Sequence, residues 1–144
     1  LGAGSFGKIR RTWKKGERIE LDLPMALRFV KGTKSQTGRV AVMYGPRVFT
    51  LNPERNPDIG DTNPRRLMID PATLEGPFPD DSVRPGGRSC TVKAWEATDW
   101  YPQAPHKWTL KLTEFPDSEG KASYFLVPNP ALPGYVDDEL MGKR

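Results

Sequence analysis

A cluster of aromatic and charged residues between positions 95 and 108 has the side chains that a sugar-binding surface needs. Aromatic faces suit the C–H-rich faces of sugar rings. Carboxylates accept hydrogen bonds from sugar hydroxyls. Trp100 and Tyr101 stand together before Pro102, in a stretch with the character of an exposed loop. We therefore take Trp100 and Tyr101 as candidate carbohydrate-binding residues. The whole cluster comprises Trp95, Glu96, Asp99, Trp100, Tyr101, His106 and Trp108.

Structural roles compete with sugar binding for the same aromatic residues. Trp95 and Trp108 fall in strand-like segments and are expected to fill the core. Trp100 and Tyr101 suit packing against a further domain at least as well, because aromatic residues are enriched at interfaces. Packing against a missing domain is the favoured interpretation of this pair.

The clustered acids do not have the arrangement of a glycosidase active site. They stand at Asp80-Asp81 and Asp137-Asp138-Glu139. Glycosidases place two carboxyl groups about 5–9.5 Å apart across a cleft, whereas adjacent side chains in a turn or tail diverge. Both clusters are expected on the solvated surface, where charged residues normally lie. We assign no catalytic residue to this chain.

Metal and disulfide chemistry have little support in the sequence. Cys90 and His106 are the single cysteine and the single histidine, so no intrachain disulfide can form. Zinc sites draw several ligands from Cys, His and carboxylates. We expect no metal site and no cofactor in this chain. Cys90 is expected as a small apolar strand residue, and His106 as a surface residue of a loop.

The glycine-rich start, residues 1–7, matches the phosphate-binding loops of kinases and dinucleotide enzymes only in its spacing. A kinase needs a lysine on the next strand, but Met43 follows Val40-Ala41-Val42, and the chain contains no His-Arg-Asp or Asp-Phe-Gly. A dinucleotide loop must follow a strand and open a helix. We interpret this segment as a flexible lead-in.

Length and charge limit the other classes. The 144 residues suit one domain, 1–144, and the net charge of +4 comes from charges of mixed sign. Without a concentrated basic stripe, nucleic acid is not an expected partner. No apolar run approaches the ~20 residues that span a bilayer, so no membrane partner is expected, and no signal peptide is visible. Because the chain begins with Leu1, we expect a fragment of a longer protein.

Short strands separated by Gly and Pro predict an all-β fold, an antiparallel β-sandwich of jelly-roll type. Alternation at residues 107–113 places Trp108, Leu110 and Leu112 inward, and the apolar run 39–44 predicts a strand covered on both faces. Further strands are expected at 47–51, 90–95 and 122–127, with a turn at 116–120.

Residues 9–23 and residues 52–89 are predicted to have different local structures. Residues 9–23 read as a hairpin, with Ile19, Leu21 and Leu23 on one face of its second strand and Gly16 in the turn. Residues 52–89 form a Pro-, Gly- and Asp-rich insertion, in which only 66–69 suits a short strand. Proline lowers unfolded-state entropy, so we expect order without much regular structure there.

Three segments together resemble a known family. The run from Ile9 to Met25 contains Arg-Thr-Trp-Lys-Lys-Gly-Glu and ends in Leu-Pro-Met. Gly38 to Phe49 and Phe115 to Phe125 add further similarity. The chain resembles the β-sandwich that follows the helical barrel in β-L-arabinofuranosidase-type glycoside hydrolases (family 127 and relatives). Tyr44 stands where that family usually has arginine.

The resemblance implies a non-catalytic role. In that family catalysis belongs to an (α/α)6 barrel, where a cysteine nucleophile works beside a zinc ion held by further cysteines and a glutamate. This chain carries no such set, so its expected partner is its own missing catalytic domain, with a glycan as a second expected partner. The resemblance is compatible with a secreted or periplasmic parent.

Three hypotheses remain open at this point. The first is an accessory domain of a glycoside hydrolase, which predicts a broad exposed apolar patch. The second is a stand-alone carbohydrate-binding module, which predicts an aromatic platform with glycan affinity. The third is a structural or protein-interaction domain, which predicts neither.

Overall fold

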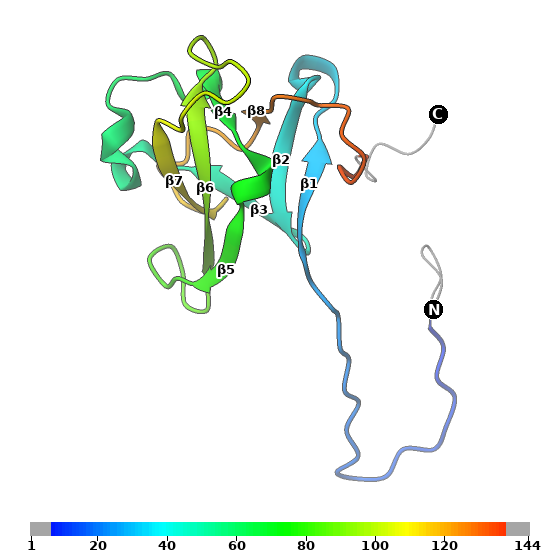
Figure 1. Ribbon diagram of the computed structural model, residues 1–144. Helices are drawn as coiled ribbons and strands as arrows, with labels where there is room; N and C mark the ends of the chain where they lie inside the picture. The colour runs from blue at the N-terminus through cyan, green and yellow to red at the C-terminus, as the bar shows by residue number, and fades with distance from the viewer. Residues whose placement is uncertain (1–6, 138–144) are drawn as a thin grey trace.

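The computed structural model describes residues 7–137, and this part of the chain is all-β, as the sequence predicts. It contains strands and short 3-10 turns but no α-helix (Figure 1). The strands are β1 (Leu27–Lys31), β2 (Arg39–Tyr44), β3 (Arg47–Leu51), β4 (Leu67–Ile69), β5 (Glu75–Pro79), β6 (Arg88–Glu96), β7 (Trp108–Glu114) and β8 (Phe125–Leu126). The 3-10 turns are η1 (Lys34–Gln36), η2 (Pro53–Arg55), η3 (Pro57–Ile59), η4 (Pro64–Arg66) and η5 (Pro71–Thr73).

The strands form one mixed sheet that closes on itself. Its order is β1-β2-β3-β7-β6-β4-β8, and β8 also pairs with β2, which completes a circuit of hydrogen-bonded strands. β5 adds to β6 from outside the circuit. Pairing between strands is antiparallel everywhere except between β4 and β8. Closure leaves few free edges along which unpaired backbone groups would be exposed.

The core occupies the inside of this circuit. Its fully buried side chains include Val40, Phe49, Leu110, Leu112 and Phe125, which come from β2, β3, β7 and β8. The inward alternation predicted for β7 is thus confirmed at its two leucines. In β2, three consecutive residues are buried, so both faces of that strand are covered as predicted.

The insertion 52–89 is ordered through its prolines. Pro53, Pro57, Pro64 and Pro71 each begin a 3-10 turn, where the fixed φ is favourable and the missing N–H has no partner to lose. The expected short strand is present as β4. β5 was not expected because it contains two prolines, and it pairs with β6 alone, as an edge strand can.

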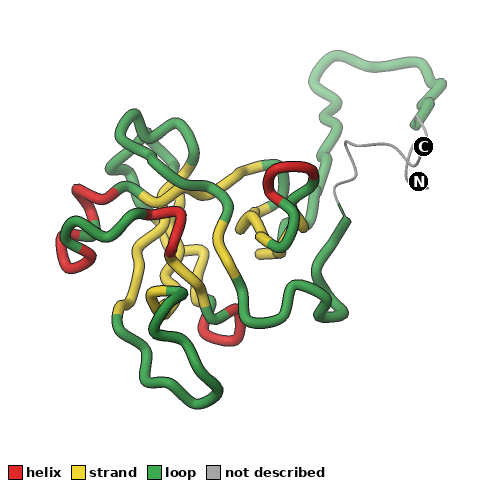
Figure 2. The backbone as a smooth tube through the Cα atoms, turned by 90° about the horizontal axis from the view of Figure 1, so that it is seen from above, coloured by secondary structure: helices red, strands yellow, loops and turns green. Residues whose placement is uncertain are grey.

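The predicted hairpin at 9–23 is wrong. Residues 7–26, here called the arm, contain no strand and extend away from the body of the molecule (Figures 1 and 2). Its turn does form, with Glu17 N donating to Lys14 O at 3.1 Å and Gly16 at φ 91°. A strand also needs a neighbour for its backbone groups. Apart from Ala26 O, which accepts from Gly45 N at 3.4 Å where the arm joins β1, the body offers the described arm no backbone hydrogen bond.

Two further strands differ from expectation. β1 was not predicted, although it follows the arm directly and pairs with β2 over five residues, Leu27 with Tyr44 through Lys31 with Val40. The last strand, expected over 122–127, is reduced to the two residues of β8. β8 lies between β2 and β4, so it is short but central to the closure.

Candidate functional site

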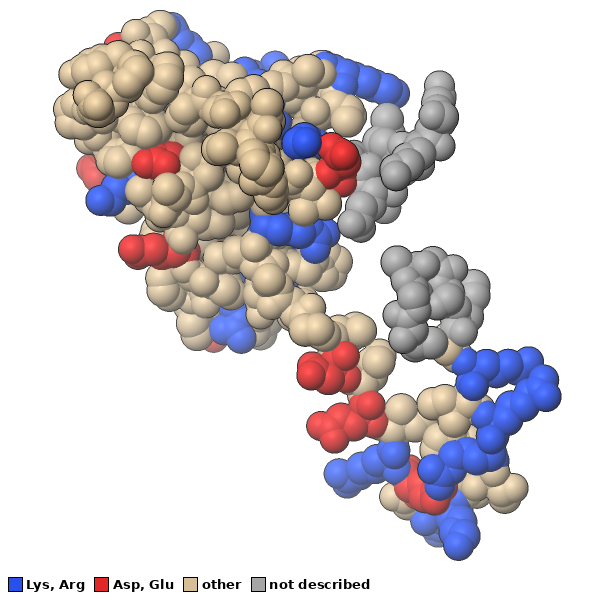
Figure 3. Space-filling view, turned by 45° about the vertical axis from the view of Figure 1, so that its right-hand side comes forward, with Lys and Arg blue, Asp and Glu red and all other residues tan. Residues whose placement is uncertain are grey.

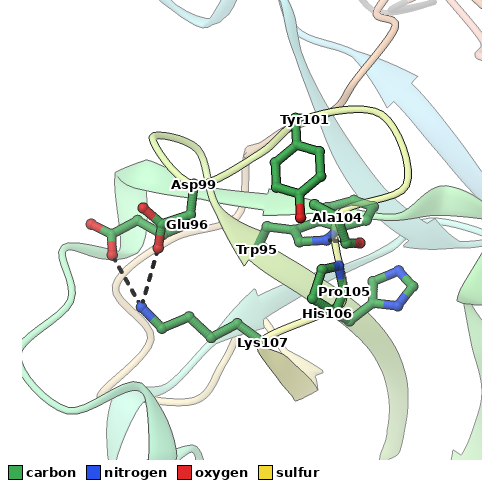
Figure 4. A pocket seen from close by; sticks show the side chains of 8 residues that line it. All are labelled: Trp95, Glu96, Asp99, Tyr101, Ala104, Pro105, His106 and Lys107. Carbon is green, nitrogen blue, oxygen red and sulfur yellow. Dashed lines mark hydrogen bonds and ion pairs between the residues drawn. The ribbon is translucent and has the colours of Figure 1, made fainter.

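A hollow of about 390 Å³ lies beside the end of β6 and the start of β7. The loop that joins these strands folds over it (Figure 4). The residues around it come largely from the cluster selected in the sequence. We call it the aromatic hollow, and it is lined by Trp95, Glu96, Asp99, Tyr101, Ala104, Pro105, His106 and Lys107.

Trp95 and His106 form one wall of the aromatic hollow. Trp95 is buried, and its Nε1 donates to Ala104 O at 2.9 Å. The imidazole of His106 stacks on the indole with 4.5 Å between ring centroids, and its Nε2 lies 2.8 Å from Asp70 Oδ2. His106 is exposed, as predicted, but stacking on Trp95 and the contact with Asp70 hold its ring in place.

Charged groups form the opposite end of the hollow. Lys107 Nζ lies 3.5 Å from both Glu96 Oε2 and Asp99 Oδ2, and Figure 4 shows the two carboxylates converging on this amine. Distances of 3.5 Å are long for hydrogen bonds. These three groups can therefore exchange partners with a bound hydroxyl, since the amine donates and the carboxylates accept.

The candidate pair Trp100 and Tyr101 is divided by the fold. Tyr101 is 57% exposed and lines the hollow, whereas Trp100 is half-buried and is not among the lining residues. The loop that presents Tyr101 is closed by Ala104 N donating to Tyr101 O at 2.9 Å. It also requires a left-handed backbone at Gln103, with φ of 70°.

Trp108 has only part of the role that the alternation predicts. It packs against the core but remains half-buried, and its Nε1 donates to Asp58 O at 2.9 Å. The Lys107 amine lies 4.5 Å from the centroid of its ring, within the range of a cation–π contact. This contact and the two carboxylates together keep the lysine amine near the hollow.

Two residues at this site were not singled out in the sequence. Asp70 is 36 positions from His106, and only the pairing of β4 with β6 brings the two segments together. The sequence around Asp70 indicates only a local role, because an Asp before Pro71 is typical of a turn cap. Asp70 Oδ1 does accept from Ala72 N. Lys107 was missed because it stands at the beginning of an alternating strand.

The acidic clusters lie apart from the aromatic hollow. Asp80, expected to be solvated, has a side chain only 9% exposed and pairs with Lys111 Nζ at 2.8 Å. Burial alone would raise the pKa of Asp80, but hydrogen bonds from Lys111 and Ser82 outweigh it and hold the pKa well below its ordinary value. Asp81 and Asp137 are exposed, as predicted.

The remaining candidates are structural or lie outside the described residues. Cys90 is fully buried in β6, as expected, and burial raises its pKa to about 12, so it is no nucleophile at neutral pH. Asp138, Glu139 and the glycine-rich residues 1–6 lie outside the described part. Within residues 7–137, no three His, Cys, Asp or Glu side chains gather into a set that could hold a metal ion. The same residues include no helix of the length and hydropathy needed to cross a membrane.

Comparison with known proteins gives one structural likeness. No family model matches the chain, and no curated protein matches its sequence significantly. The fold is similar to part of the crystal structure of a GH127 β-L-arabinofuranosidase from Geobacillus stearothermophilus T6, with a TM-score of 0.52 and 19% identity. The match covers 72% of this chain and 18% of that chain. At this identity the likeness shows the fold alone, and the chain spans less than a fifth of the enzyme's length.

Proposed function

We propose that this chain is the non-catalytic accessory β-sandwich domain of a glycoside hydrolase and that it packs against a separate catalytic domain. The observation that carries the proposal is the match of this fold to a minor part, 18%, of a glycoside hydrolase chain. The residues that resemble family 127 in sequence belong to the sandwich of that family, and the cysteines of its catalytic barrel have no counterpart here.

The arm offers the surface for this packing. Ile19, Leu21 and Leu23 are 65%, 74% and 67% exposed, and they alternate with charged residues along an extended backbone. Such a segment can add to the edge of another sheet, where backbone hydrogen bonds give affinity and alternate side chains enter an apolar surface. We propose that the rest of the same enzyme supplies that surface.

The charges of the arm fit the same geometry. Figure 3 shows the arm as a projection rich in Lys and Arg, with acidic residues between them. Glu17 is held within the turn, where it pairs with Arg11 and accepts from Lys14 N at 3.0 Å. In the docked arm the apolar side of residues 18–23 faces the partner, and Arg18, Glu20 and Asp22 stay in water.

The coding sequence upstream of Leu1 tests the proposal directly. We expect several hundred residues with helical periodicity, several cysteines and a glutamate in the family arrangement. A start codon immediately before Leu1 would remove the catalytic domain and with it the accessory role. Co-purification with the separately expressed upstream region gives a second measurement, and Leu21→Lys should weaken it while Glu20→Gln should not.

A carbohydrate contact at the aromatic hollow is the second part of the proposal, and the exposed ring of Tyr101 beside three charged groups favours it. Tyr101→Ala should abolish retention on a glycan array or affinity gel. Trp100→Ala is the matched control, because Trp100 lies next in sequence but does not line the hollow. Retention that persists in Tyr101→Ala would contradict sugar binding here.

The same variants separate the alternatives. Glycan retention by the chain alone, with no upstream catalytic region, would favour a stand-alone binding module. Neither retention nor an upstream catalytic region would favour a structural or protein-interaction domain, because a fold alone does not fix function.

A further inference from the structure

A second, smaller hollow lies on other elements of the fold and is lined by cations. It has a volume of about 110 Å³ and is formed by the end of η1, the start of β2, η4 and the segment before β8. We call it the cationic hollow. Its lining residues are Gln36, Arg39, Arg65, Lys121, Ala122, Ser123 and Tyr124.

Two of its three cations have no acidic partner. Among residues 7–137, no carboxylate lies within ion-pair distance of Arg39 or Arg65. Lys121 pairs with Glu119 at 3.0 Å, but both side chains are about half exposed, so this pair holds the amine weakly. Three positive charges around one small hollow repel one another, and a bound anion would relieve that repulsion.

The backbone of the cationic hollow is held by the sheet. Arg39 pairs with Leu126 in the β2–β8 ladder, and Lys121 N donates to Leu51 O at 2.8 Å. One guanidinium nitrogen of Arg39 donates to Arg65 O at 2.9 Å, which orients this side chain and leaves its other N–H groups available. The two arginines are thus brought together by contacts within the fold.

The lining is complementary to an oxyanion. Arginine presents several N–H donors in a plane that matches carboxylate, sulfate or phosphate oxygens. Gln36, Ser123 and Tyr124 add neutral donors, and no acidic residue lines the hollow. We propose that the cationic hollow binds an oxyanion, either a free inorganic ion or the charged group of an acidic sugar, with Arg39 and Arg65 as its principal ligands. It shares no residue with the aromatic hollow.

Binding of inorganic sulfate and phosphate to the full chain tests this inference. Backbone NMR shifts are followed while either anion replaces chloride at constant ionic strength, so that general screening stays fixed. We expect saturable shifts that centre on residues 36–39, 65 and 121–124. Arg65→Gln should weaken binding at least tenfold, because it removes one of the two principal ligands. The Arg65 side chain makes no ion pair within the described fold, so the substitution should leave the fold intact. Lys93→Gln is the charge-matched control, since Lys93 is exposed on β6, and it should leave binding unchanged.

The conservative variant and the ligand panel complete the test. Arg39→Lys keeps the charge but loses the planar donor fork, so binding should weaken severalfold without being lost. Galacturonate and a sugar sulfate distinguish an acidic sugar, which would bind more tightly than the inorganic ions, from a free anion, which would not. Linear, unsaturable shifts, or equal responses of Arg65→Gln and Lys93→Gln, would overturn the proposal.

Discussion

At the scale of single residues, Asp117 ties together two segments that are distant in sequence, the start of the insertion and the end of β7. Its carboxylate accepts from Asn52 Nδ2 at 2.9 Å, from Arg55 Nε at 2.7 Å and from Thr113 Oγ1 at 2.9 Å. Burial alone would raise the pKa of Asp117, but these hydrogen bonds outweigh it and lower the pKa below its ordinary value. The start of the insertion is thereby fixed to β7 and to the turn that follows it.

Asp117→Asn should lower the free energy of unfolding by about 1–3 kcal/mol at pH 7, because it leaves buried donors poorly paired. The folded pKa lies below the unfolded value of about 3.9. The carboxylate's contribution is therefore fully present above that pH and is lost as pH falls through the folded pKa. Urea denaturation at pH 7 and at pH 2.5 should show the difference between Asp117→Asn and the native chain shrinking in acid.

Asp137→Asn provides the control for this pH dependence. Its side chain is 91% exposed, so it should change stability little at either pH. Equal effects of the two substitutions at pH 7 would show that the Asp117 network contributes nothing specific.

At the scale of elements, the closure of the sheet depends on the two residues of β8. Phe125 is fully buried and pairs with Val40, while Leu126 pairs with Met68 of β4. Phe125→Ala should cost about 3–5 kcal/mol, the range for large aromatic side chains deleted from a core. Chemical denaturation measures that loss, and hydrogen exchange should show faster opening of the β2 amides.

Leu126→Ala on the same strand is the matched control. Leu126 is only partly buried, so its truncation should cost clearly less than that of Phe125. A similar loss for both would mean that β8 matters through its backbone pairing and not through the buried ring.

The same elements show which parts of the fold and the site the sequence can predict. Alternation identified β7, and an apolar run identified β2, because each pattern reports the burial of its own strand. The arm has an equally clear alternation but no neighbour, and periodicity cannot say where a partner is. The aromatic cluster was found because its residues stand close in sequence. The Asp70–His106 contact was not, because it depends on the pairing of β4 with β6.

At the scale of the whole molecule, the closed body and the arm differ in whether their apolar side chains are buried. The body buries its apolar side chains within one circuit of strands, and none of its core residues comes from the arm. The arm leaves its three alternating aliphatic side chains in water, which is costly unless another surface covers them. The body thus packs its core without the arm, and the arm's aliphatic side chains have no cover within residues 7–137.

Replacing Ile19, Leu21 and Leu23 together by Thr, Lys and Thr tests this division. The isolated chain should self-associate less in sedimentation experiments, because exposed apolar segments with unpaired backbone groups can pair with one another as strands. The thermal midpoint should stay within about 2 °C of the native value, since none of the three side chains belongs to the core. The matched control neutralises Arg18, Glu20 and Asp22, on the polar side, and should leave association unchanged. A fall of many degrees in the triple variant would instead mean that the arm packs on the body, and the interface with a catalytic domain would then have to lie elsewhere.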